Sequence, residues 1–136
     1  MRVVVIDGMG GGIGKAIIER VKAEVSGIEI IAVGTNSAAT SAMLKAGADH
    51  GATGENAVSY NAARADFVVG VVGIVFANSM HGEISPKMAE AVSSAPAHKI
   101  LIPIDKCNVT ITGISAVTIQ SHISEVVEKL RVSLDF

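Results

Sequence analysis

A glycine-rich turn between an apolar run and a helical pattern constrains this chain more than any other feature. Residues 3–6 are four consecutive β-branched residues, and residues 8–14 contain five glycines. Glycine permits positive φ and lets other backbone or a ligand approach closely. A strand, a bare loop and a helix N-terminus together form an anion site, because free N–H groups and the helix dipole both favour negative charge. The turn therefore predicts that a phosphate-bearing ligand, such as a nucleotide, binds here.

Hydrophobic periodicity divides the rest of the chain into strands and helices. Strands are expected at residues 2–7, 28–33, 67–76, 99–104 and 109–114, and a loop at 48–54. Helices are expected at 12–25, 38–46, from 53 or 54 to 64, at 85–95, and from 118 or 121 to 132. This order predicts an α/β fold with an open, mainly parallel, five-stranded sheet and helices on both faces. Right-handed crossovers favour a Rossmann-like strand order such as 3-2-1-4-5. We expect residues 1–136 to form one Rossmann-like nucleotide-binding domain.

Composition narrows the classes of function. Apolar residues make up 49% of the 136 residues, and the mean hydropathy is +0.49. A parallel sheet covered on both faces explains this value, as does apolar surface buried in an oligomer. We therefore expect a homo-oligomer. The formal net charge of −2 and the 3% of aromatic residues argue against nucleic acid as a partner.

Cysteine content and the N-terminal sequence indicate the compartment. Cys107 is the only cysteine, which excludes an intrachain disulfide and favours a reducing environment. The strand pattern begins at once, and no signal-peptide pattern precedes it. The longest uncharged apolar stretch, residues 67–80, is shorter than the ~20 residues that a membrane helix needs. We expect a cytoplasmic protein with no membrane contact.

The glycine turn resembles a known nucleotide-binding motif. The spacing of Gly8, Gly12 and Gly14 is similar to the NAD(P)-binding turn of short-chain dehydrogenases, across the first strand, the turn, the first helix and the second strand. The resemblance implies NAD(P) or another nucleotide as the cofactor. It places the cofactor against Gly8, Gly10, Gly11, Gly12, Ile13 and Gly14.

The sequence also departs from that family. The catalytic Tyr-x-x-x-Lys pair of that family is absent, because the position four residues after Tyr60 is Arg64 and not lysine. The acidic residue that holds the ribose hydroxyl after the second strand is missing too. Thr35 and Asn36 stand there instead, as uncharged groups that could bind a ribose or a 2′-phosphate. Asp7 disfavours a phosphate directly above it, but could bind a ribose hydroxyl, a metal or a backbone N–H.

Two other interpretations of the glycine turn stay open. The first is a P-loop, for which Gly14 and Lys15 are suitable. However, Ala16 replaces the hydroxyl residue that holds Mg²⁺, and Met9 occupies the place of the first glycine. The second is a turn whose glycines only permit tight packing of the first helix on the sheet.

A second polar cluster follows the 67–76 strand and should lie at the same carboxyl edge of the sheet. Asn78 and Ser79 offer hydrogen-bonding side chains for a cofactor, and His81 or Glu83 offers a catalytic base. The alternative is a surface loop whose polar side chains are simply solvated.

A third cluster follows the 99–104 strand. Asp105 is a further catalytic candidate, whereas Cys107 would be a nucleophile only beside a base, and a lone cysteine is more often inert. The remaining histidines, His50, His98 and His122, lack metal-ligand spacing, so we expect no metal site.

Taken together, several segments resemble one family along nearly the whole chain. Residues 6–15, 46–49, 53–57, 82–84 and 102–103 look like those of short bacterial proteins defined only as a domain of unknown function. The resemblance implies a Rossmann-like fold and supplies no reaction and no catalytic residues.

The leading hypothesis is a Rossmann-like protein that binds a nucleotide or another phosphate ligand, acting as a small sensor or ligand-binding module. The alternative is a small NAD(P)-linked reductase, or a transferase on a phosphorylated substrate, with its site at the carboxyl edge of the sheet. A third hypothesis is a structural subunit whose apolar surface serves assembly.

Overall fold

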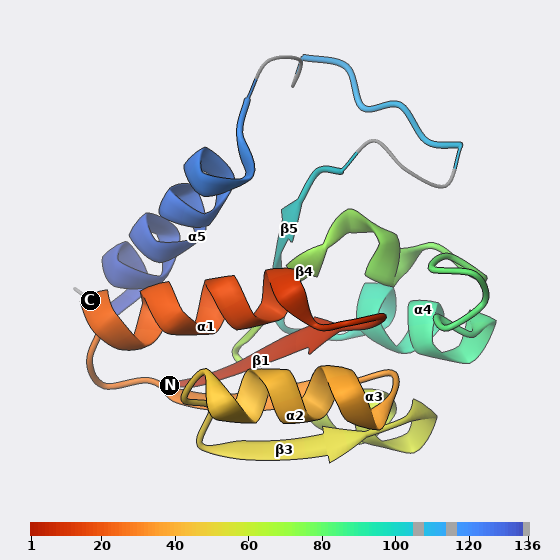
Figure 1. The fold of residues 1–136 in the computed structure, drawn as a ribbon, viewed down its shortest axis with the longest axis horizontal. Coiled ribbons are helices and arrows are strands. Elements are labelled where there is room, and N and C mark those ends of the chain that lie inside the picture. The colour runs from red at the N-terminus through yellow and green to blue at the C-terminus, as the bar shows by residue number, and fades with distance from the viewer. Residues whose placement is uncertain (105–107, 114–116, 135–136) are drawn as a thin grey trace.

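The computed structural model describes residues 1–104, 108–113 and 117–134. In these ranges the strands form one parallel sheet in the order β3-β2-β1-β4-β5, which confirms the predicted α/β fold with a parallel five-stranded sheet (Figure 1). The predicted strand order 3-2-1-4-5 counted other strands and is wrong in its pairings: it placed residues 67–76 beside the second strand, whereas they pair with β1. The strands are β1 (Arg2–Asp7), β2 (Glu29–Gly34), β3 (His50–Thr53), β4 (Phe67–Val71) and β5 (His98–Ile102). The helices are α1 (Gly12–Glu24), α2 (Ser37–Lys45), α3 (Glu55–Ala62), the 3₁₀ helix η1 (Val72–Val75), α4 (Pro86–Ser94) and α5 (Ile119–Leu134).

Helices cover both faces of the sheet, as the sequence predicts. One apolar cluster lies between the sheet and α1, α2 and α5, and a second lies between the sheet and α3, η1 and α4. The run at residues 3–6 supplies both, because successive strand side chains point to opposite faces. Val3 and Val5 enter the first cluster, whereas Val4 and Ile6 enter the second. Burial on both faces explains why β1 is apolar at consecutive positions.

Local signals start two helices where the sequence predicts. Asn36 caps α2 by accepting a 2.9 Å hydrogen bond from the Ala39 amide. Ser85 caps α4 through a 3.1 Å bond from the Met88 amide, and Pro86 occupies the first helical position.

The prediction of a loop at 48–54 is wrong. Residues His50–Thr53 form β3, an edge strand that pairs with β2 alone. Its glycine and exposed polar residues resemble a loop because one long side of the strand has no neighbour. Gly51 still packs closely, since a Cβ there would lie 2.8 Å from Leu44 Cδ1. The following helix consequently begins at Glu55 and not at Thr53 or Gly54.

The predicted strand at 109–114 is also wrong, because residues 109–113 contain no strand and residue 114 lies outside the described residues. Alternating apolar and threonine residues fit a strand, but none of the described strands pairs with them. The 67–76 strand is shorter than predicted. It ends at Val71, paired with Ile102, and η1 follows. Its partner β5 stops immediately before Pro103, which has no N–H for a sheet.

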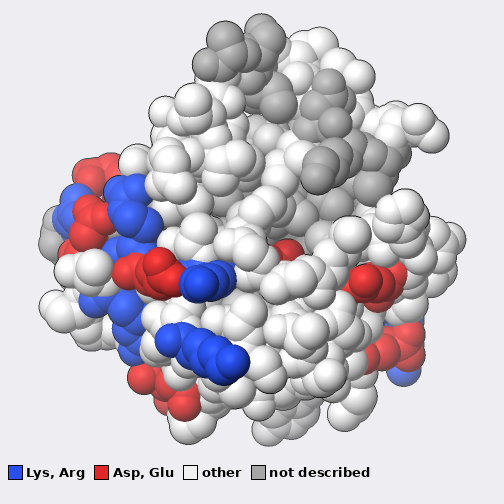
Figure 2. All heavy atoms as spheres, in the orientation of Figure 1, with Lys and Arg blue, Asp and Glu red and all other residues white. Residues whose placement is uncertain are grey.

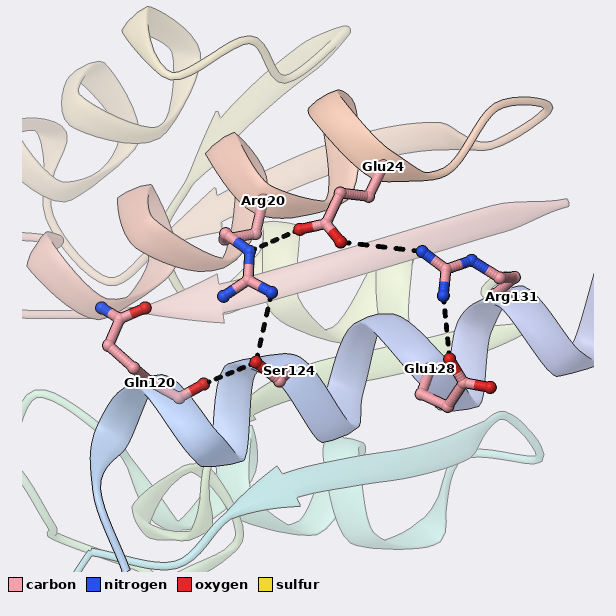
Figure 3. Close-up of polar contacts among 6 residues, drawn as sticks. All are labelled: Arg20, Glu24, Gln120, Ser124, Glu128 and Arg131. Atoms are coloured by element: carbon pink, nitrogen blue, oxygen red, sulfur yellow. Dashed lines mark hydrogen bonds and ion pairs between the residues drawn. The ribbon is translucent and has the colours of Figure 1, made fainter.

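A surface network aligns α5 against α1 (Figure 3). Arg20 bonds Glu24 and donates a 3.2 Å hydrogen bond to Ser124 Oγ. Arg131 Nη2 lies 3.6 Å from Glu24 Oε1, and Arg131 Nη1 lies 2.8 Å from Glu128 Oε2. These groups are partly exposed, so they orient the helix more than they stabilise it. Buried Ile123, Val126, Val127 and Leu130 supply most of the contact with the core.

Charged side chains are unevenly distributed over the surface. On the face shown in Figure 2 most of those in the described residues lie on the left, near the C-terminus, where α1 and α5 end. Among the described residues, no helix combines the length and the apolar character needed to cross a membrane.

Candidate functional site

A cavity of about 810 Å³ lies where β1 and β4 end. Its size falls within the range of small-molecule sites, which is roughly 300–1,000 Å³. The glycine loop, residues 7–13, forms one wall, and residues 71–73 with parts of the following loop form another. Among the described residues most of the lining is apolar, and its polar side chains are those of Asp7, Asn78, His81 and Asn108. The cavity therefore suits a ligand with a large apolar part and a small polar one.

Several amides of the glycine loop are occupied by the protein itself. Asp7 Oδ1 accepts a 2.8 Å bond from the Gly8 amide, and Oδ2 accepts a 2.7 Å bond from the Gly14 amide. The Gly11 amide bonds the Gly8 carbonyl oxygen at 3.0 Å. Of the roles considered for Asp7, the structure has it binding backbone N–H groups.

Three other amides of the same loop stay available. Those of Gly10, Gly12 and Ile13 have no acceptor among the described residues, and all three residues line the cavity. Gly12 and Ile13 are the first two residues of α1, whose first N–H groups have no acceptor within the helix. The helix dipole adds positive potential at this end. An anion in the cavity would lie beside three amides that have no acceptor in the described part of the chain.

The electrostatics around Asp7 are mixed. Asp7 is only 6% exposed, and burial raises its pKa above the ordinary value. The Gly14 and Gly8 amides oppose this by stabilising the ionised carboxylate, whereas the charge of Glu83 raises the pKa further. The cavity lining therefore includes the Asp7 carboxyl group, whose ionisation burial disfavours and whose orientation the Gly8 and Gly14 amides fix.

The glycines of the turn serve two different purposes. A Cβ at Gly14 would lie 2.6 Å from Met43 Sδ and 3.0 Å from Asp7 Cβ, so this glycine permits close packing of α1 on the sheet. A Cβ at Gly10 or Gly12 would meet no heavy atom within 4 Å. Packing thus explains Gly14, while Gly10 and Gly12 face open space beside the cavity.

Four residues expected to bind a cofactor lie behind the loop, outside the cavity lining. Gly14 donates its amide to Asp7, and Ser79 Oγ donates to the Gly73 carbonyl oxygen. Thr35 Oγ1 and Asn36 Nδ2 donate to Glu83 Oε1 at 2.6 and 3.0 Å. The other expected residues line the cavity, namely Gly8, Gly10, Gly11, Gly12, Ile13 and Asn78.

The second polar cluster divides in the same way. His81 lines the cavity, whereas Glu83 is half-buried behind the glycine loop. The Met9 amide, followed by Thr35 and then Asn36, lowers the pKa of Glu83 by hydrogen bonding to the carboxylate. Glu83 is thus held ionised, a state in which it cannot act as a general acid.

Unusual backbone conformation is concentrated on this wall. Asn78, Met80 and His81 all have positive φ, at 67°, 57° and 55°, and all three line the cavity. Such conformations are uncommon for residues other than glycine and cluster at functional sites. A 2.7 Å bond from the Asn78 amide to the Ile84 carbonyl oxygen closes the loop.

The third catalytic candidate, Asp105, and the neighbouring Cys107 lie outside the described residues. In the described ranges, no group of three or more His, Cys, Asp or Glu side chains could hold a metal ion. Sequence reasoning missed the apolar wall of the cavity, which includes Val72, Phe76 and Ile104. Its one available signal was the position of these residues just after the ends of strands.

Comparisons with known proteins support the fold and leave the reaction open. The family model described as "Domain of unknown function (DUF3842)" matches residues 2–135. No curated protein matches the sequence. A similar solved structure is that of a dodecameric FMN-dependent UbiX-like decarboxylase from Escherichia coli O157:H7. It is 14% identical, with a TM-score of 0.52, and the match covers 100% of this chain and 96% of the other. At this identity the likeness establishes the α/β fold alone.

Proposed function

The chain belongs to the DUF3842 family, and from that premise and the cavity geometry we propose that it binds a nucleotide-like ligand whose phosphate rests on the glycine loop. The amides of Gly10, Gly12 and Ile13 carry the proposal, because they have no acceptor in the described part of the chain and line one cavity. Backbone N–H groups at a helix N-terminus are a recurrent way to bind phosphate.

The apolar wall supports a ligand with a planar or otherwise apolar body. Val71, Val72 and Phe76 provide surface for such a body, and Asp7 can accept a hydrogen bond from a ligand hydroxyl. Flavin mononucleotide combines these features, and the similar decarboxylase is described as FMN-dependent. We therefore propose flavin mononucleotide as the first ligand to test.

NAD(P) fits this site less well. A dinucleotide of this kind would place its adenosine ribose near the end of β2. There, Thr35 and Asn36 already donate to Glu83 Oε1, and Asn36 Nδ2 also donates to the Met9 carbonyl oxygen at 3.0 Å. A ribose would have to displace these bonds, and the carboxylate that usually receives its hydroxyls is absent from the end of β2.

Ligand retention and titration test the proposal. Native mass spectrometry of the purified protein should detect a bound phosphate-bearing molecule. Calorimetric titration of the ligand-free protein should give tighter binding of flavin mononucleotide than of riboflavin, which lacks only the phosphate. Equal affinity for the two, or binding of neither together with a ligand-free purified protein, would contradict phosphate recognition by the loop.

One observation favours an enzymatic role at the same site. His81 lines the cavity on a loop of strained backbone, in a position to exchange a proton with a bound ligand. We propose proton transfer by His81 in a small reductase or transferase as the second candidate function. With an identified substrate, His81→Ala should retain binding and lose turnover. Unchanged turnover would remove His81 from this role.

Assembly and domain organisation complete the proposal. Met9, Tyr60 and Val132 are among the large apolar side chains that are at least 46% exposed, which suits contacts between copies. The similar decarboxylase is dodecameric. We propose a homo-oligomer in which residues 1–136 form one domain, and light scattering on the purified protein measures the number of copies. A monomer at micromolar concentration would contradict the assembly.

A further inference from the structure

Glu83 joins three segments of the chain through a single oxygen atom. Its Oε1 accepts hydrogen bonds from the Met9 amide at 2.7 Å, from Thr35 Oγ1 at 2.6 Å and from Asn36 Nδ2 at 3.0 Å. We call these three bonds the Glu83 clasp. Glu83 itself does not line the cavity, so it acts on a ligand through the residues that it holds and through its charge, which also raises the pKa of Asp7.

The clasp and one further hydrogen bond from Asn36 fix the peptide groups on both sides of Met9. Glu83 holds the Met9 amide, while Asn36 Nδ2 donates to the Met9 carbonyl oxygen at 3.0 Å. Met9 has a φ of 52°, which a non-glycine residue rarely adopts unless its surroundings impose it. The two bonds, from Asn36 and to Glu83, are the surroundings that impose it here.

The orientation of Met9 determines that of the next amide. The Met9 carbonyl and the Gly10 N–H belong to one planar trans peptide unit, in which the two groups point in opposite directions. Because Asn36 holds the carbonyl oxygen on the far side, the Gly10 N–H points away from Asn36. Gly10 lines the cavity and Asn36 does not, so this amide is directed toward the ligand side.

Gly8 provides separate support for the importance of the clasp. A Cβ on Gly8 would lie 2.7 Å from Thr35 Oγ1, 2.8 Å from Glu83 Oε1 and 2.8 Å from Met80 Sδ. A side chain at Gly8 would therefore collide with two atoms of the clasp. The absence of a side chain there makes room for the clasp, beyond any contact that Gly8 makes with a ligand.

We propose that Glu83 is a positioning residue that presets the glycine loop for an anion. Glu83 holds the Met9 amide directly and holds Asn36 Nδ2, which in turn binds the Met9 carbonyl oxygen, so that the Gly10 amide is already oriented when the phosphate arrives. The loop that carries Glu83 also carries Asn78 and His81, which line the cavity. The clasp therefore links this loop to the glycine loop on the other wall of the cavity. This inference rests on the proposed phosphate site, and its test is designed to separate the two.

The test compares Glu83→Ala and Glu83→Gln with Glu90→Ala, a control on the exposed surface of α4. Flavin mononucleotide and riboflavin serve as probes because they differ only in the phosphate. Glu83→Ala should weaken binding of flavin mononucleotide about tenfold, which is the effect of losing one charge-assisted hydrogen bond between the Gly10 amide and the phosphate. Riboflavin binding should stay unchanged. Glu83→Gln should recover part of the loss, since its amide oxygen can accept the same donors. Glu90→Ala should change neither affinity.

Amide hydrogen exchange gives a measurement that needs no ligand. The Met9 amide should be protected in the wild type and in Glu83→Gln, and should exchange rapidly in Glu83→Ala while the β1 amides stay protected. Rapid exchange of the wild-type Met9 amide would overturn the clasp. If Glu83→Ala does not fold, Glu83→Gln carries both measurements, and its flavin mononucleotide affinity should fall only to the extent that exchange of its Met9 amide accelerates. Rapid exchange of that amide together with flavin mononucleotide affinity equal to that of the wild type would overturn the proposal.

The outcomes separate the two proposals. Wild-type protein that binds flavin mononucleotide no better than riboflavin contradicts both the phosphate site and a positioning role toward it. A wild-type preference for flavin mononucleotide that Glu83→Ala retains in full overturns only the role of Glu83. Equal weakening of both probes by Glu83→Ala also overturns that role, because a general structural defect does not distinguish the phosphate.

Discussion

The Gly14 amide donates a 2.7 Å hydrogen bond to Asp7 Oδ2, joining the first turn of α1 to the last residue of β1. The other Asp7 oxygen accepts the Gly8 amide, so one carboxylate holds the beginning and the end of the glycine turn. This arrangement divides the loop amides into those used by the protein and those left for a ligand. The predictions below follow from that division.

Asp7 makes the stability of the protein depend on pH in an unusual direction. Burial raises its pKa above the ordinary 3.8, so the folded chain binds this proton more tightly than the unfolded chain. The contribution of Asp7 to the free energy of unfolding is therefore largest below pH 3.8, and it declines as the pH rises through the raised pKa. The decline is about 1.4 kcal/mol for each unit by which folding raises the pKa.

Urea denaturation over a pH series, compared with Asp7→Asn, measures this contribution. The free energy of unfolding of the wild type minus that of Asp7→Asn should fall as the pH rises. Carboxylates that titrate in both proteins largely cancel in this difference. A difference that grows with pH would contradict the account of Asp7.

Gly14→Ala should destabilise the protein, because its Cβ would lie 2.6 Å from buried Met43 Sδ and 3.0 Å from Asp7 Cβ. Overpacking of this kind costs about 1–3 kcal/mol. Gly12→Ala is the matched control in the same helical turn, where a Cβ meets no heavy atom within 4 Å. Thermal denaturation should show a lower Tm for Gly14→Ala alone, and equal Tm values would contradict the packing role.

Asp49 stabilises the junction of α1, β2 and β3. Its Oδ2 accepts 2.8 Å bonds from the Ile30 amide and from Lys22 Nζ, and the Ile30 amide, followed by Lys22, lowers its pKa. Asp49→Ala should cost about 1 kcal/mol at neutral pH. Because a lowered pKa contributes stability that is lost on acidification, the cost should shrink as the pH falls through that pKa. A cost that is constant down to acid pH in urea titrations would argue against the ionised contact.

Gly12→Val should fold and yet lose the phosphate-dependent part of ligand binding. The new side chain meets no heavy atom near its Cβ, but it branches beside the amides of Gly12 and Ile13, which have no acceptor among the described residues. Calorimetry with flavin mononucleotide and riboflavin should give equal, weak affinities for this variant. Wild-type affinity for flavin mononucleotide would exclude this part of the loop as the phosphate site.

The α/β class and the parallel sheet were predictable from the sequence because they depend on local chemistry and on crossover handedness. The pairing of individual strands was not, because one strand was missed and another was predicted where none lies. The buried run of β1, the glycine turn and the Ser85-Pro86 helix start are all short-range signals. β3 was missed because an edge strand with one partner lacks a continuous apolar run. Residues 109–113 have the alternation of a strand, but pairing depends on a neighbour that no local pattern specifies.

The candidate site was predictable only in outline. The sequence places the glycine loop and Asn78 and His81 at one sheet edge, and the structure puts them around one cavity. It could not indicate which loop amides the protein itself occupies. That depends on side chains distant in sequence, such as Glu83, which is 74 residues from Met9 and hydrogen bonds its amide.

The central claim is that the amides of Gly10, Gly12 and Ile13 bind the phosphate of a ligand. Titration of ¹⁵N-labelled protein with flavin mononucleotide and then riboflavin, followed by amide chemical shifts, tests it most directly. The account predicts that these three amides shift strongly with flavin mononucleotide and little with riboflavin, while those of Gly8 and Gly14, bonded to Asp7, shift less. Unchanged shifts of the three amides at saturating flavin mononucleotide would contradict it.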